Sequence, residues 1–122
     1  MSMSELAVLL VLLAQFDPAI TFYCQIDAFS KERQAEFKRI EVEGTYRSSF
    51  EVRSFTPIGS NESWWVSTRA LKDLMAERNA TKLRIVIRGM LSPEGRYGHV
   101  RRYSRCLANP EVVKVLGPPS EG

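Results

Sequence analysis

The chain has 122 residues and a formal net charge of +3, with 44% hydrophobic and 25% charged residues. This length gives room for one domain around one core, and this composition excludes an intrinsically disordered chain. The basic excess is local: Lys82–Arg105 has seven basic residues and one acidic residue, a sum of +6, whereas the other ten basic and 13 acidic residues sum to −3. Such a segment can meet phosphate, an anionic lipid or an acidic partner, or it can be the solvated side of a strand.

Residues 1–19 contain a continuous apolar stretch of nine residues, Leu6–Ala14. A membrane-spanning helix needs about 20 residues, but nine suit the apolar region of a secretory signal peptide. Met1–Glu5 has no Lys or Arg, so the alternative is a buried helix with Ser4 as its N-cap. We therefore expect a leader or a buried helix at 1–19, a single domain at 20–116 and a flexible tail at 117–122.

The first half of the domain is expected to be mainly strands. Ile20–Ile26 has extended character, and Lys31–Lys38 is a charged connector that can form a helix. Alternation of apolar and polar residues from Ile40 to Arg47 predicts a half-buried strand. The same pattern predicts a second strand at Phe50–Phe55 and a short third strand at Trp64–Val66.

The second half is expected to begin with a helix. Thr68 is placed as its N-cap, apolar residues follow at helical spacing, and Asn79 offers a left-handed stop. Leu83–Leu91 has the clearest strand alternation in the chain. A fifth strand is expected at Val112–Leu116, extended backward through 103–107 with a bulge at Asn109-Pro110.

Two of these strands share the pattern Arg-Ile-x-apolar-x-Gly-x-apolar, at Arg39–Tyr46 and at Arg84–Leu91. A glycine inside a strand usually marks a bend, a bulge or a close backbone approach. Two strands that bend in the same phase are what the closure of a small barrel requires.

The order of three strands, a helix and two strands resembles the OB-fold, a five-stranded Greek-key barrel with a helix between strands three and four. The resemblance covers about Ile40–Leu116 and rests on element order and glycine placement. In addition, Trp64–Val66, followed by Gly89–His99 and Tyr103, is similar to small uncharacterised bacterial proteins that are made with export leaders. This second resemblance implies no activity. If residues 1–19 are an export leader, the protein is periplasmic or secreted; if they form a buried helix, the alternative is a cytoplasmic protein.

Few residues could carry catalysis. His99 is the only histidine, so a nucleophile and base pair would have to combine it with Cys106. The acidic residues form no pair with separate acid and base roles, and the cysteines lack the spacing of a zinc site. We therefore expect no catalytic centre, metal or cofactor. Cys24 and Cys106 are expected to pair in an oxidising compartment, or to be two buried thiols in a reducing one.

The predicted function is that of a non-catalytic binding or scaffolding module of the bacterial cell envelope, whose partner is a protein or an anionic component. The alternative is an OB-type protein that binds single-stranded nucleic acid. In OB-folds the ligand lies across strands two and three, between the loop that joins strands one and two and the loop that joins strands four and five. Arginines beside exposed aromatic rings would suit single-strand binding there. The residues that this resemblance implies are Arg96, Tyr97, His99, Arg101, Arg102, Tyr103, Trp65 and Phe55.

Overall fold

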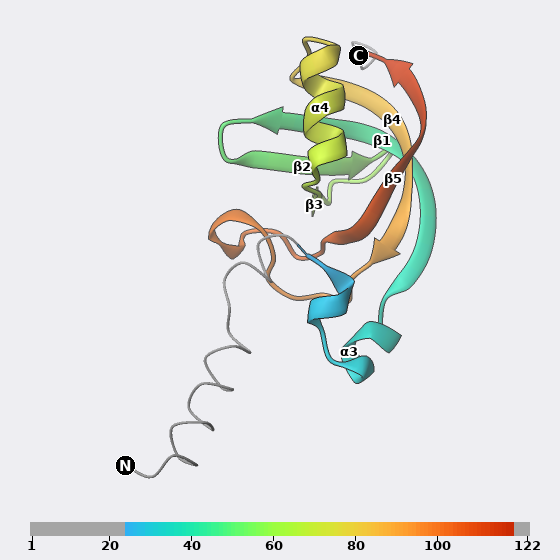
Figure 1. Cartoon of the computed structure of the whole chain (residues 1–122), viewed down its shortest axis with the longest axis vertical. Coiled ribbons are helices and arrows are strands. Elements are labelled where there is room, and N and C mark those ends of the chain that lie inside the picture. The colour runs from blue at the N-terminus through green and yellow to red at the C-terminus, as the bar shows by residue number, and fades with distance from the viewer. Residues whose placement is uncertain (1–23, 119–122) are drawn as a thin grey trace.

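The computed structural model of the chain describes residues 24–118 (Figure 1). The predicted leader at 1–19 and most of the predicted tail lie outside these residues. Neither of the two described α-helices has the length and apolar composition needed to cross a bilayer. In chain order the elements are η1 (Ile26–Ala28), α3 (Lys31–Ala35), β1 (Lys38–Ser49), β2 (Val52–Pro57), β3 (Trp64–Trp65), α4 (Arg69–Glu77), β4 (Lys82–Leu91), η2 (His99–Arg101) and β5 (Leu107–Gly117).

The five strands form one antiparallel sheet in the order β3-β2-β1-β4-β5. This confirms a mainly β fold with α4 between the third and fourth strands (Figure 1). The sheet is not closed, so the predicted barrel stays a prediction. Among the described residues, one parallel bridge joins the two edges of the sheet, between Trp65 and Cys106. There the Trp65 backbone N–H donates to the Arg105 carbonyl at 2.9 Å.

Some predicted boundaries are wrong. The second strand begins at Val52, because Phe50 and Glu51 form the tight turn that joins β1 to β2, with Ser49 opposite Val52. Ile26 begins a 3₁₀ turn and is not extended. The charged connector does contain a helix, α3, whose N-cap Ser30 accepts a hydrogen bond from the Arg33 N–H.

The last strand starts later than the predicted backward extension through 103–107 and ends one residue later than predicted. β5 starts at Leu107 and includes Gly117, which was expected to belong to the tail. It runs through the predicted bulge, where Asn109 has a φ of 49° and the register with β4 shifts. A bulge bends its strand, so β5 can follow the curvature of β4.

The main core lies between α4 and the concave face of the sheet. Thr68 caps α4 as predicted, accepting from the Leu71 N–H at 3.2 Å, and Asn79 ends it with a φ of 49°. Leu71 and Met75 form the buried stripe of the helix. They belong to the same buried cluster as the alternating residues of β4 that were expected inside, Leu83, Ile85 and Ile87.

The two strands with the shared glycine pattern are neighbours, β1 and β4. Their register places Ile40 opposite Gly89 and Gly44 opposite Ile85. Each glycine is closely approached from the side of the next strand: a Cβ at Gly89 would lie 2.8 Å from the Ala108 carbonyl oxygen, and one at Gly44 would collide with the Thr56 carbonyl. The glycines therefore let β5 and β2 pass close to the two central strands.

The buried Tyr46 on β1 is expected to make the stability of the core depend on pH. Its side chain is fully buried, and its hydroxyl donates to the Val66 carbonyl at 2.9 Å. Burial disfavours the phenolate and raises the pKa of Tyr46 to about 12, even though the nearby Arg53 opposes the shift. A pKa that is higher in the folded state than in the unfolded state gives stability that is present below pH 10 and is lost as pH rises toward 12.

We expect Tyr46→Phe to remove this component of the pH dependence. The wild type should lose roughly 2–3 kcal/mol more than the variant in its free energy of unfolding between pH 9.5 and 12. Urea unfolding across this pH range measures the difference. Below pH 9 the variant should itself be less stable by about 1 kcal/mol, because the Val66 carbonyl loses its donor. Parallel curves for the two proteins would contradict the prediction.

Candidate ligand-binding cleft

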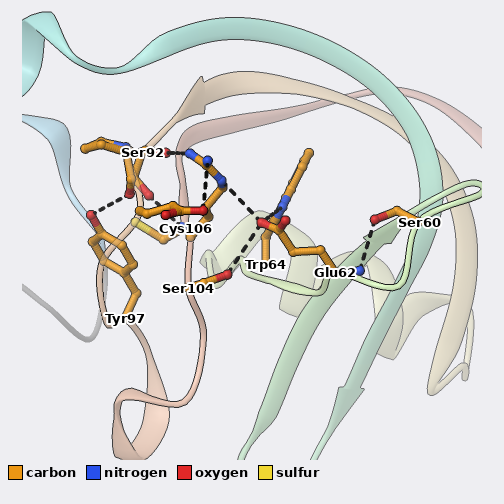
Figure 2. Close-up of polar contacts among 10 residues, drawn as sticks. Ser60, Glu62, Trp64, Ser92, Tyr97, Ser104 and Cys106 are labelled. Carbon is orange, nitrogen blue, oxygen red and sulfur yellow. Dashed lines mark hydrogen bonds and ion pairs between the residues drawn. The ribbon is translucent and has the colours of Figure 1, made fainter.

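The loop between β4 and β5, residues 92–106, is fixed at its base. The buried Ser92 donates its backbone N–H to the Cys106 carbonyl at 2.9 Å, and its Oγ accepts from the Cys106 N–H at 2.9 Å (Figure 2). Cys106 also forms a disulfide with Cys24, 82 residues away in sequence. In the chain-entropy view a bridge over so long a loop stabilises the fold by about 4 kcal/mol. The loop therefore begins and ends at a rigid point.

Arg105 is a structural residue of this base. Its guanidinium donates to the Ser92 carbonyl at 2.9 Å and lies 3.3 Å from the Glu62 carboxylate and 3.6 Å from that of Glu94. Glu62 also accepts from the Trp64 indole at 2.9 Å and from the Ser104 hydroxyl at 3.5 Å (Figure 2). The network links the segment before β3 to the end of the loop.

Inside the loop, aromatic side chains form a second small core. The backbones of Tyr97 and Tyr103 exchange hydrogen bonds of 2.8 and 3.2 Å. The Tyr103 ring packs 5.4 Å from the Trp65 ring, centroid to centroid, and Gly98 lies so close to Trp65 that a Cβ there would overlap the indole. Tyr97 reaches back to the turn, donating its hydroxyl to the Pro93 carbonyl at 3.0 Å (Figure 2).

The structure therefore corrects the expected role of the aromatic residues. Phe55 and Trp65, together with Tyr97 and Tyr103, are at most 8% exposed. Both tryptophans are buried, Trp64 in the main core and Trp65 in the second core, so neither is a stacking platform. A base could stack on these rings only if the fold opened.

The tip of the loop is the part that faces solvent. Val100 has a φ of 50° and Arg101 a φ of 54°, a conformation that is uncommon for any residue but glycine and costly for a β-branched one. Val100 is 72% exposed, and its neighbours Arg101 and Arg102 are exposed too. The tip thus presents an apolar side chain beside two cations.

A cleft of about 700 Å³ opens between this tip, the β1–β2 turn and the start of α4. His99 and Glu51 link two of these parts, since His99 Nε2 lies 3.3 Å from the Glu51 carboxylate. In Figure 1 the β1–β2 turn and the 92–106 loop project on the same side of the molecule. The residues that line the cleft are Phe50, Glu51, Arg53, Trp65, Ser67, Thr68, Arg69, Lys72, Asp73 and His99.

Ion pairs divide the cations of the basic segment into two groups. Arg84 and Arg88 pair with acidic residues of the neighbouring strands: Arg84 with Glu43 at 3.8 Å, and Arg88 with Glu111 at 2.8 Å. The Glu111 carboxylate raises the pKa of Arg88, and Arg88 lowers the pKa of Glu111. Arg105 is paired as described above. By contrast, the described part of the chain shows no ion pair for Arg96, Arg101 or Arg102 of this segment, and none for Arg69 or Lys72 in the first turn of α4.

Of the eight residues predicted to bind ligand, the structure brings only Trp65 and His99 to the lining of the cleft, and Trp65 contributes from a buried position. Arg101 and Arg102 follow His99 by two and three residues, and Arg96 is exposed on the same loop. The prediction missed Phe50, Arg69 and Lys72. The sequence did contain a signal for Arg69 and Lys72. Both lie in the first turn of α4, where a cation is unfavourable because it opposes the helix dipole, so their presence there indicates another role.

Most of the side chains that line the cleft are polar or charged. They supply hydroxyl, guanidinium, ammonium, imidazole and carboxylate groups. In the described part of the chain, no three His, Cys, Asp or Glu side chains are grouped to hold a metal ion.

The chain matches no protein-family model, no curated protein and no solved structure.

We expect Ser92→Ala to destabilise the protein by about 1–3 kcal/mol, because the buried Cys106 N–H would lose its acceptor. Ser104→Ala is the matched control: Ser104 is exposed and its hydroxyl makes a long hydrogen bond, of 3.5 Å, to Glu62, so the change should alter stability by less than about 0.5 kcal/mol. Urea unfolding of both variants under oxidising conditions measures the difference. Equal stability of the two variants would show that the Ser92 hydroxyl does not hold the loop base.

Proposed function

We propose that this protein is a non-catalytic OB-type module of the cell envelope that binds an anionic component in the cleft between the β1–β2 turn, α4 and the 92–106 loop. The observation that carries the proposal is the position of this cleft. It lies beside the two loops that flank the ligand of an OB-fold, and Arg69 and Lys72, which make no ion pair within residues 24–118, line it from a third element, α4.

The topology supports the OB-type assignment. In a closed barrel of this order the third and fifth strands would pair, and the parallel bridge between Trp65 and Cys106 is a first step of such pairing. The bulge in β5 and the glycines of β1 and β4 provide the curvature that closure needs. We infer that the sheet is a barrel whose third strand is short.

The disulfide between Cys24 and Cys106 supports an oxidising compartment, such as the periplasm or the cell exterior. We expect both cysteines to resist alkylation in protein taken directly from cells, and to react only after reduction and unfolding. Mass spectrometry of the alkylated protein measures this. Complete alkylation of unfolded but unreduced protein would place the chain in a reducing compartment instead.

Anion binding can be tested with inorganic phosphate and glycerol 1-phosphate, titrated while amide NMR spectra are recorded. We expect shifts at Glu51, at His99 and in the first turn of α4. Arg69→Ala combined with Lys72→Ala should weaken binding about tenfold or more, because charge-assisted hydrogen bonds are lost.

Arg78→Ala combined with Lys82→Ala is the matched control. It removes two exposed cations near the opposite end of α4 and should leave the titration unchanged. Equal effects of the two double variants, or no shift with either anion, would overturn the proposal.

Single-stranded nucleic-acid binding is the second candidate, and the exposed Arg96, Arg101 and Arg102 favour it. The buried rings and the disulfide count against it. An oligothymidylate titrated in low salt separates the two candidates. Binding that falls steeply with salt, and that is lost on Arg101→Ala with Arg102→Ala, would favour nucleic acid. The anionic-component proposal expects no length-dependent affinity for the oligonucleotide.

A further inference from the structure

Two exposed apolar side chains stand on either side of the cleft. Phe50, in the β1–β2 turn, is 89% exposed, and Val100, at the tip of the 92–106 loop, is 72% exposed. Their chain neighbours Glu51 and His99 are in contact at 3.3 Å, so the two tips flank one point of the surface. In Figure 1 both loops lie toward the left of the view.

Neither apolar side chain is explained by the fold. A two-residue turn between antiparallel strands favours Asn, Asp or Gly, and a phenylalanine there leaves its ring in water. A β-branched residue with a positive φ at a loop tip is likewise unfavourable for folding. Single exposed apolar residues are common, but these two flank one contact, between Glu51 and His99, and so can meet the same partner.

Cations surround these tips. Arg101 and Arg102 follow Val100, while Arg69 and Lys72 lie on the cleft that also includes Phe50. None of the four makes an ion pair within residues 24–118. The acidic side chains of the cleft are Glu51, which contacts His99, and Asp73. The surface is thus apolar at two protruding points, with Arg101 and Arg102 beside one of them, and the cleft has three cations, Arg53, Arg69 and Lys72, against two carboxylates.

We propose that this surface docks on an anionic phospholipid bilayer, with Phe50 and Val100 inserted at the boundary of the hydrocarbon and a lipid phosphate in the cleft. Peripheral membrane surfaces combine apolar side chains, which enter this boundary, with Lys and Arg, which attract anionic headgroups. A protein partner would need a contiguous and complementary patch with an apolar centre. Here the apolar groups are separate, and the centre between them is a polar cleft.

This inference rests on the proposed function, because it identifies the anionic component as a lipid headgroup. The two can fail separately. Soluble glycerol 1-phosphate tests the cleft alone, whereas vesicles test the cleft and the apolar tips together. Shifts with glycerol 1-phosphate and no binding to vesicles would overturn the docking inference and leave the proposed function standing.

The test is co-sedimentation of the full chain with vesicles of phosphatidylcholine containing 30 mol% phosphatidylglycerol, a ratio chosen to be about one anionic lipid in three. We expect Phe50→Ser to weaken the partition coefficient about tenfold and Val100→Ser several-fold, because apolar area no longer leaves water. Arg101→Ala with Arg102→Ala should weaken it by about tenfold or more in low salt and by less in high salt.

Ile58→Ser is the matched control. Ile58 is also exposed, at 57%, but it follows β2 at the end away from the β1–β2 turn. A strand rises about 3.3 Å per residue, so this end of β2 is roughly 17 Å from Val52. The control should bind vesicles as the wild type does. Phe50→Trp should also retain binding, and its fluorescence should be quenched by lipids with brominated chains.

Three results would overturn the inference. The first is equal binding of the wild type, Phe50→Ser and Val100→Ser, which would assign any membrane affinity to another part of the chain, such as the apolar residues 6–14. The second is an equal loss with Ile58→Ser. The third is equal binding to vesicles of phosphatidylcholine alone, which would exclude recognition of an anionic headgroup.

Discussion

The junction at Cys106 is the constraint on which the rest of the structure depends. Four interactions meet at this residue: the disulfide to Cys24, two hydrogen bonds with Ser92, and the parallel bridge to Trp65. They bring together the N-terminal end of the described chain, the end of β4, the end of β3 and the start of β5. Because a loop is only as well placed as its ends, this junction gives the 92–106 loop its position relative to the β1–β2 turn.

The buried aromatic residues of the 92–106 loop also hold the loop in place. A loop of this length can hold a fixed shape only if its own side chains pack. Tyr97 and Tyr103 do so against Trp65, so the rings that were expected to bind ligand are used to support the tip. The cost is that they present no face to a partner. What remains exposed at the tip of the loop is Val100 with Arg101 and Arg102.

Charge pairing makes the basic segment less unusual than its composition indicates. Arg84 and Arg88 complete cross-strand ion pairs on the solvated face of the sheet, as the alternation of β4 indicates, and Arg105 joins the loop base. Exposed pairs of this kind contribute little to stability, but they neutralise the face. The cations at the loop tip and at the start of α4 make no ion pair within residues 24–118, and those at the start of α4 line the cleft.

The sequence by itself determined which face of β4 is buried, where α4 starts and ends, and that β1 and β4 need a glycine, because period, capping and backbone freedom are local properties. The sequence also indicated that Cys24 and Cys106 could pair in an oxidising compartment. Only the tertiary structure decided that Phe50, Arg69 and His99 share one cleft and that Tyr97 and Tyr103 are buried. The physical reason is that alternation shows which side of an element is apolar, whereas the meeting of distant loops depends on strand order, register and the junction at Cys106.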